Sequence, residues 1–143
     1  MFLGEFEHTI DEKGRITVPA KFRGRLAAGM VITKGIDECL WLYPIDGWQK
    51  LAEKVSTLRI TDPKAREFNR QVFGGALDAV PDRQGRVNMP TYLREYANID
   101  KQAVFVGLYD HCEIWNADRW RERQISSHQD PEGRAALFES LGI

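Results

Sequence analysis

The sequence predicts an α+β protein made of two similar halves that pair into a small β-barrel. Residues 11–19, Asp-Glu-Lys-Gly-Arg-Ile-Thr-Val-Pro, return as residues 82–90, Asp-Arg-Gln-Gly-Arg-Val-Asn-Met-Pro, at an offset of 71 residues. The same order of strand-like and helix-like segments follows each copy, as in duplicated supersecondary units. Each half has only short strands with exposed edges, so we expect the halves to pair with each other.

The first half opens with a strand, a tight turn and a second strand. Residues 5–10 alternate polar and apolar side chains, and residues 15–18 resume that period after the turn. Gly14 supplies the positive φ of a tight turn, and the short side chain of Asp11 can accept backbone hydrogen bonds inside it. Pro19 cannot extend the ladder and suits the first turn of a helix.

The helix is expected from residue 19 to about residue 28, and a second hairpin from the runs 30–33 and 40–43. Two linking helices follow. We expect the first to be capped by Asp46, and the second by Asp62, which precedes a proline at the first helical position.

The second half repeats this order, with strands at 76–80 and 87–89, a helix from Pro90, and a hairpin of 103–106 and 112–115. A last helix is capped by Asp130 and ends at Gly142. The predicted divisions are 5–47 (first module), 48–75 (linking helices), 76–119 (second module) and 120–143 (C-terminal helical segment).

Composition is ordinary for a soluble globular domain, with 143 residues, 43% hydrophobic and 29% charged. No apolar run approaches the roughly 20 residues of a membrane helix, and no secretory leader opens the sequence, so a cytoplasmic protein is expected. Cys39 and Cys112 favour buried core positions over a disulfide. No cofactor or metal is expected, because there is no Cys-x-x-Cys pair and the histidines are scattered at His8, His111 and His128.

Charge is unevenly distributed although the net charge is only −1. Residues 11–35 hold six basic and two acidic side chains, whereas residues 82–107 hold four basic and three acidic ones. A local basic face can neutralise phosphates on a nearly neutral protein. A solvated helix face is the alternative interpretation of the first run.

The repeated Asp and Arg of the motif have two compatible interpretations. In the structural one, Asp11 caps its loop and forms a bidentate ion pair with Arg15 that holds the hairpin in shape. In the functional one, basic side chains on both rigid loops reach phosphates and the acceptor edges of guanine. Pairing with Asp11 would then orient Arg15 before DNA arrives.

The two motifs, the Lys21-Phe22-Arg23 segment and the linking helices together resemble the MraZ family of bacterial transcriptional regulators, over the whole chain. Each half resembles the swapped-hairpin module of the AbrB and SpoVT DNA-binding proteins. The resemblance implies two pseudo-symmetric modules of this kind in a double-split β-barrel. Arg15 and Arg23 match basic positions of the AbrB type, and local charge adds Lys13 and Arg25.

The resemblance also implies a sequence-specific DNA-binding regulator associated with the nucleoid. It implies a repressor of its own operon, in the cell-division and cell-wall gene cluster, that binds double-stranded promoter DNA as a ring-shaped homo-oligomer. The candidate DNA-binding residues are Lys13, Arg15, Arg23, Arg25, Arg83 and Arg86, supported by Asp11, Gly14, Pro19, Asp82, Gly85 and Pro90. Because the first copy carries more positive charge, we expect it to dominate DNA contact.

Two other classes of function stay open at this stage. An enzyme is disfavoured because the sequence has neither a phosphate-binding Gly-x-x-x-x-Gly-Lys-Ser/Thr loop nor a Gly-x-Ser-x-Gly elbow, although a site could be assembled from distant residues. A ring-forming scaffold or antitoxin-like binding module is the other alternative. Its interface would use tryptophans that otherwise pack the core and the subunit contact, namely Trp41, Trp48, Trp115 and Trp120.

Overall fold

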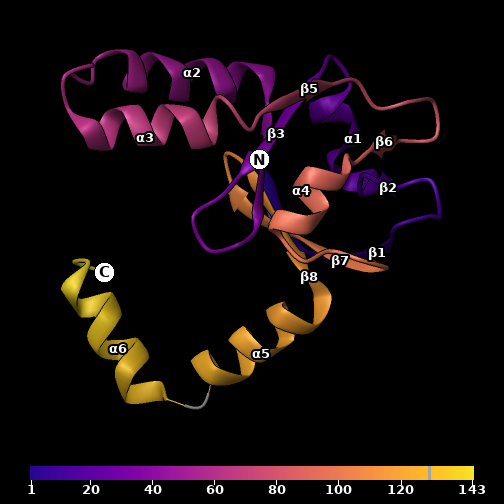
Figure 1. Cartoon of the computed structure of the whole chain (residues 1–143). Coiled ribbons are helices and arrows are strands. Elements are labelled where there is room, and N and C mark those ends of the chain that lie inside the picture. The colour runs from indigo at the N-terminus through magenta and orange to yellow at the C-terminus, as the bar shows by residue number, and fades with distance from the viewer. Residues whose placement is uncertain (129) are drawn as a thin grey trace.

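The structure, a computed structural model, describes residues 1–128 and 130–143. It is an α+β fold with an antiparallel sheet and helices around it (Figure 1). The strands are β1 (Phe2–Thr9), β2 (Arg15–Thr17), β3 (Met30–Lys34), β4 (Leu40–Pro44), β5 (Leu77–Ala79), β6 (Arg86–Asn88), β7 (Gln102–Tyr109) and β8 (Cys112–Asn116). The helices are α1 (Ala20–Leu26), α2 (Ile45–Ser56), α3 (Pro63–Val72), α4 (Thr91–Tyr96), α5 (Ala117–His128) and α6 (Pro131–Ser140).

The two halves interleave. A six-stranded sheet has the order β1-β7-β8-β4-β3-β5, and β2 pairs with β6 in a separate two-stranded sheet. All strand pairs are antiparallel. The first strand of each half lies beside a strand of the other half: β1 pairs with β7, and β5 pairs with β3. The strands β1 and β5 are the two edges of the larger sheet, and no described strand pair joins them. A closed barrel is therefore not shown by the pairing.

The expected hairpin between the first two strand segments is reduced to one bridge, between Ile10 and Ile16. Beyond it, β1 pairs along its whole length with β7, from Phe2 opposite Tyr109 to Thr9 opposite Gln102. The ladder with β7 occupies one edge of β1, and β2 pairs with β6 of the other half. The first two strand segments therefore form separate long-range pairs and keep only the Ile10–Ile16 bridge between them.

The main core lies inside this interleaved arrangement and draws on both halves. The apolar residues of each motif point into it: Ile16 and Val18 are each 1% exposed, Val87 is 4% exposed, and Met89 is fully buried. The aromatic ring of Phe22 packs edge-on against that of Phe2, with 5.1 Å between centroids. Because strand side chains alternate, burying these positions turns the motif's polar side chains outward.

The opposite face of the larger sheet is covered in part by α5. Trp115 is buried there beside Trp120, with ring centroids 5.5 Å apart. Trp41 and Trp48 are half-buried. The tryptophans thus serve packing within the chain, at least in part.

Cys39 and Cys112 are both buried free thiols, as expected, and burial raises the pKa of each to about 12.

The helix caps agree with the sequence in two places and differ in one. The carboxylate of Asp62 accepts a hydrogen bond from the Lys64 amide at 2.9 Å, and that of Asp130 accepts one from the Gly133 amide at 2.9 Å. Asp46 was wrongly expected to cap α2. Because β4 runs directly into α2, this helix starts at Ile45, and Asp46 lies in its first turn.

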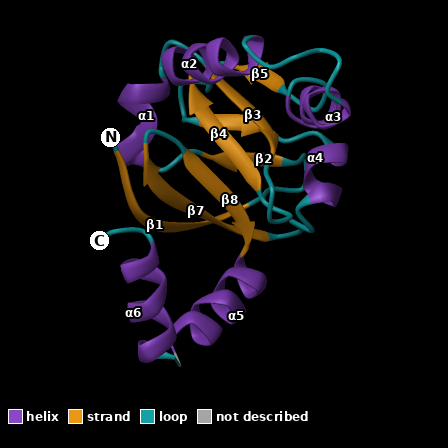
Figure 2. Ribbon diagram, turned by 90° about the vertical axis from the view of Figure 1, so that its left-hand side faces the viewer, coloured by secondary structure: helices purple, strands orange, loops and turns teal. Residues whose placement is uncertain are grey.

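The helices α2 and α3 lie at one end of the molecule, whereas α5 and α6 extend from the other (Figures 1 and 2). No residue of α6 is buried. No helix in the described part of the chain is long and apolar enough to cross a membrane.

Replacing Ile16 tests the strand pairing between the halves. Ile16→Ala should lower the free energy of unfolding by about 2–5 kcal/mol, because it opens a cavity where β2 meets β6. Ile60→Ala, at a side chain that is 80% exposed, should change it by less than about 0.5 kcal/mol. Urea unfolding followed by circular dichroism measures both, and equal effects would contradict the assigned core.

Candidate nucleic-acid interface

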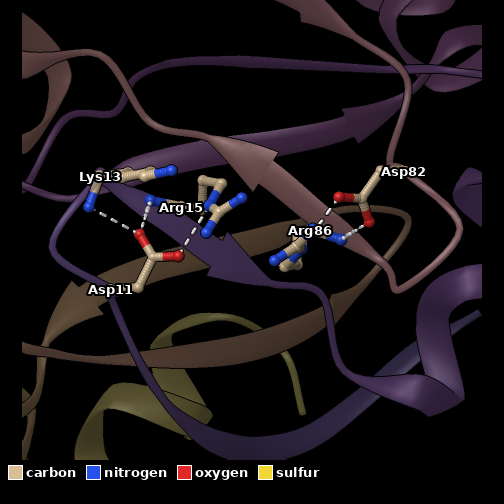
Figure 3. Close-up of polar contacts among 5 residues, drawn as sticks. All are labelled: Asp11, Lys13, Arg15, Asp82 and Arg86. Atoms are coloured by element: carbon tan, nitrogen blue, oxygen red, sulfur yellow. Dashed lines mark hydrogen bonds and ion pairs between the residues drawn. The ribbon is translucent and has the colours of Figure 1, made fainter.

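Two loops of the same construction lead into β2 and β6. We call residues 11–14 the first loop and residues 82–85 the second loop. In the first, Oδ1 of Asp11 accepts hydrogen bonds from the amides of Lys13 and Arg15, each at 2.9 Å (Figure 3). In the second, Oδ1 of Asp82 accepts hydrogen bonds from the amides of Gln84 and Arg86 at the same distance.

The loop glycines meet a conformational requirement. Gly14 has φ +79° and Gly85 has φ +78°, in the left-handed region that costs other residues about 1–2 kcal/mol. The amide of each glycine donates to the backbone carbonyl of the aspartate that opens its loop, at 3.0 and 2.9 Å. Each loop is therefore a tight turn built around a carboxylate, as the sequence predicts.

Each aspartate also holds the arginine that begins the following strand. Nε of Arg15 donates to Oδ2 of Asp11 at 2.7 Å, and Nε of Arg86 donates to Oδ2 of Asp82 at 2.9 Å (Figure 3). The expected bidentate pairing is wrong, because Oδ1 already binds backbone amides. Within the described residues, the terminal Nη groups of both arginines make no hydrogen bond, and the side chains are 33% and 32% exposed.

The hydrogen bonds keep both carboxylates ionised. The backbone amide of Arg15, and then its side chain, lower the pKa of Asp11, and Arg86 lowers the pKa of Asp82 in the same way. A lowered pKa in the folded state stabilises the fold above the ordinary value of 3.8, and this contribution disappears as pH falls through the folded pKa. Both carboxylates therefore accept these hydrogen bonds in their ionised form in the neutral range.

The pair β2–β6, which we call the ribbon, joins the loops. Ile16 lies opposite Val87, and both point into the core. The neighbouring positions therefore face solvent, where strand alternation places four polar side chains on one side. This solvent face of the ribbon consists of Arg15, Thr17, Arg86 and Asn88. Since the strands are antiparallel, the two loops lie at opposite ends of the ribbon (Figure 3).

A second pair of arginines crosses between the halves. Nε of Arg23 donates to the Val18 carbonyl at 3.0 Å, and its guanidinium covers Gly85, where an added Cβ would lie 2.8 Å from Cζ. Nε of Arg94 donates to the Met89 carbonyl at 2.9 Å, and its guanidinium covers Gly14. Arg23 was selected from the sequence. Arg94 was missed, although it follows Arg23 by the same 71 residues that separate the motifs.

The remaining candidates fall into two groups. Lys13 and Arg83 lie on the loops with exposed side chains. Arg25 lies elsewhere: both of its Nη groups donate to the carboxylate of Asp46 in α2, each at 2.9 Å. The structure therefore joins Arg25 to α2 and does not place it with the loops.

The crossing also changes the distribution of charge. The first loop together with Arg15 has a formal charge of zero, and the neighbouring Arg94 adds one positive charge. The second loop together with Arg86 has a formal charge of +1, and the neighbouring Arg23 adds another. The net charge of the sequence segments favoured the first copy. At the loops themselves, the second copy carries more positive charge than the first. The supporting prolines are placed alike, with Pro19 directly before α1 and Pro90 directly before α4.

The family model described as "MraZ protein, putative antitoxin-like" matches the chain twice, over residues 1–71 and 72–138. A protein named transcriptional regulator MraZ from Herpetosiphon aurantiacus is 52% identical over 143 residues, covering all of both chains. The protein of the same name from Halothermothrix orenii is 45% identical over 143 residues, again covering all of both chains.

A third relative, the transcriptional regulator MraZ of Thermomicrobium roseum, is 52% identical over 120 residues, or 84% of each chain. The second family match begins 71 residues after the first, which is the same offset as that of the internal repeat. By these matches over its whole length, the chain belongs to the MraZ family of transcriptional regulators.

Proposed function

We propose that this chain regulates transcription by binding double-stranded DNA through the solvent face of the ribbon. The observation that carries the proposal is that two arginine side chains, Arg15 and Arg86, each about one-third exposed, lie on one ribbon beside Thr17 and Asn88. A two-stranded β-ribbon fits the major groove of B-DNA, where Arg binds guanine O6 and N7 and Asn binds adenine. The four side chains can therefore read bases or hold phosphates.

The aspartates support this role by organising the arginines before binding. An unrestrained Arg side chain loses up to about 2 kcal/mol of rotamer entropy when it is fixed. Here Nε of Arg15 is already held by Asp11, while its terminal nitrogens remain available. The same holds for Arg86 and Asp82. Less entropy is then lost when DNA is bound.

The names of the relatives support a regulator rather than an enzyme. We propose further that the protein is a cytoplasmic, nucleoid-associated repressor of its own operon in the cell-division and cell-wall gene cluster. We also propose that its interleaved halves are AbrB-like swapped hairpins in a double-split barrel, in keeping with the exchanged pairing of β1 and β5.

Self-association into a ring is part of the proposal, and α6 supports it. In α6 and just beyond it, Leu137 is 55% exposed, Phe138 51% and Leu141 65%. A helix of ten residues is only marginally stable in water without tertiary packing, so we expect α6 to pack against another protein surface. In a ring, several ribbons would engage successive promoter repeats, and their weak contacts would multiply through effective concentration.

Single arginine variants test the contact surface. Arg15→Ala and Arg86→Ala should each weaken binding to the DNA upstream of the protein's own gene by about ten- to a hundredfold, the loss of one bidentate contact. Arg70→Ala is the matched control, because it removes the same charge from α3. Gel-shift titration measures all three, and a loss at Arg70 as large as at the ribbon would contradict the site.

Salt dependence separates a DNA-binding regulator from a scaffold or antitoxin-like protein. If both loops engage phosphates, the logarithm of the affinity should fall with the logarithm of salt concentration, with a slope near −0.9 for each phosphate neutralised. Fluorescence anisotropy at several salt concentrations measures the slope. A flat response would count against the loops as the contact surface.

Charge introduced on α6 tests self-association. The double variant Leu137→Glu with Phe138→Glu should lower the mass measured by light scattering towards that of one 16.4 kDa chain. Leu58→Glu with Ile60→Glu, at similarly exposed side chains, should leave the mass unchanged. An unaltered mass in the α6 variant would show that this helix does not hold the oligomer together.

A further inference from the structure

We propose that the two loops are positioned crosswise: Arg94 of the second half holds the first loop, and Arg23 of the first half holds the second loop. This inference rests on the proposed function only in taking the ribbon, into which the loops lead, as the DNA contact. It assigns Arg23 and Arg94 as positioning residues. A loop and the arginine that braces it therefore belong to opposite halves of the chain.

Backbone contacts establish the crossing independently of the arginines. The amide of Val18 donates to the carbonyl of Gly85 at 2.7 Å, and the amide of Met89 donates to the carbonyl of Gly14 at 2.8 Å. Each turn glycine is thus bound to the strand end of the other half. Since Val18 and Met89 also provide the carbonyls that anchor Arg23 and Arg94, backbone and side chain act at the same point.

The guanidiniums complete the brace by covering the glycines. An added Cβ at Gly14 would lie 3.2 Å from Cζ of Arg94, and one at Gly85 would lie 2.8 Å from Cζ of Arg23. The absence of a side chain at each glycine therefore serves two purposes, the positive φ and the close approach of the planar guanidinium. Both arginines are half-buried.

Arginine is required here for reasons that lysine does not meet. The Nε–H of Arg94 is anchored to the Met89 carbonyl at 2.9 Å, while Nη2 donates to Thr91 Oγ1 at 3.2 Å. A lysine keeps the positive charge but has neither the planar fork nor a donor at the Nε position. A purely electrostatic role would survive Arg94→Lys, whereas a positioning role would not.

Amide hydrogen exchange tests the brace without DNA. In Arg94→Ala and Arg94→Lys, the amides of Lys13 and Arg15 should exchange about tenfold faster, because the first loop opens more often. The two amides bound by Asp82, those of Gln84 in the second loop and of Arg86 directly after it, should keep their rates.

Arg23→Ala should give the mirror image, with faster exchange in the second loop only. Arg70→Ala controls for loss of charge, and an amide of the buried strand β7 reports whether each variant remains folded. Faster exchange confined to the loop in the same half as the substituted arginine would overturn the proposal. So would unchanged rates in both loops.

A double-mutant cycle on DNA affinity tests the functional consequence. Arg94→Ala and Arg15→Ala should be non-additive by about tenfold, because both disable the first loop. Arg94→Ala and Arg86→Ala should be additive, because they act on different loops. Coupling of Arg94 to Arg86 instead of Arg15 would refute the crosswise assignment.

The two experiments separate this inference from the proposed function. If Arg15→Ala and Arg86→Ala leave DNA affinity unchanged, the proposed contact surface fails, while the exchange data still decide the brace. If both variants weaken binding, but substituting Arg23 or Arg94 speeds amide exchange in the loop of its own half, the contact surface stands and the crosswise positioning fails.

Discussion

The antiparallel pair β2–β6 is the constraint on which the rest of the molecule depends. It joins the two motif copies directly, with Ile16 opposite Val87 beneath it in the core. Because one side of these short strands is buried, the register is fixed, and a slip of one residue would turn Arg15 and Arg86 inward. The burial of two aliphatic side chains thus determines which polar side chains face outward.

Each motif residue has a physical task in this arrangement. The glycine provides a positive φ and room for a guanidinium from the other half. The aspartate builds the loop with one oxygen and holds an arginine with the other. The proline ends the strand directly before a helix. Asp, Gly, Arg and Pro recur in both copies, and each has the same task in both.

The features that could be predicted from the sequence are those decided within a few residues. The turn at Gly14, its capping by Asp11 and the cap of α3 by Asp62 depend on local hydrogen bonds and on φ. The partner of β1 could not be predicted, because β7 begins about a hundred residues away and no local signal links the two strands. The role of Arg94 was missed because its contact with the first loop arises only when the halves interleave.

Site-directed crosslinking measures most directly whether the solvent face of the ribbon meets DNA. A cysteine introduced as Asn88→Cys can carry a photoreactive probe, since the natural Cys39 and Cys112 are buried. The account predicts crosslinks to promoter DNA from position 88 and none from a probe at Ser56→Cys, on exposed α2. Crosslinks from position 56 with none from position 88 would contradict it.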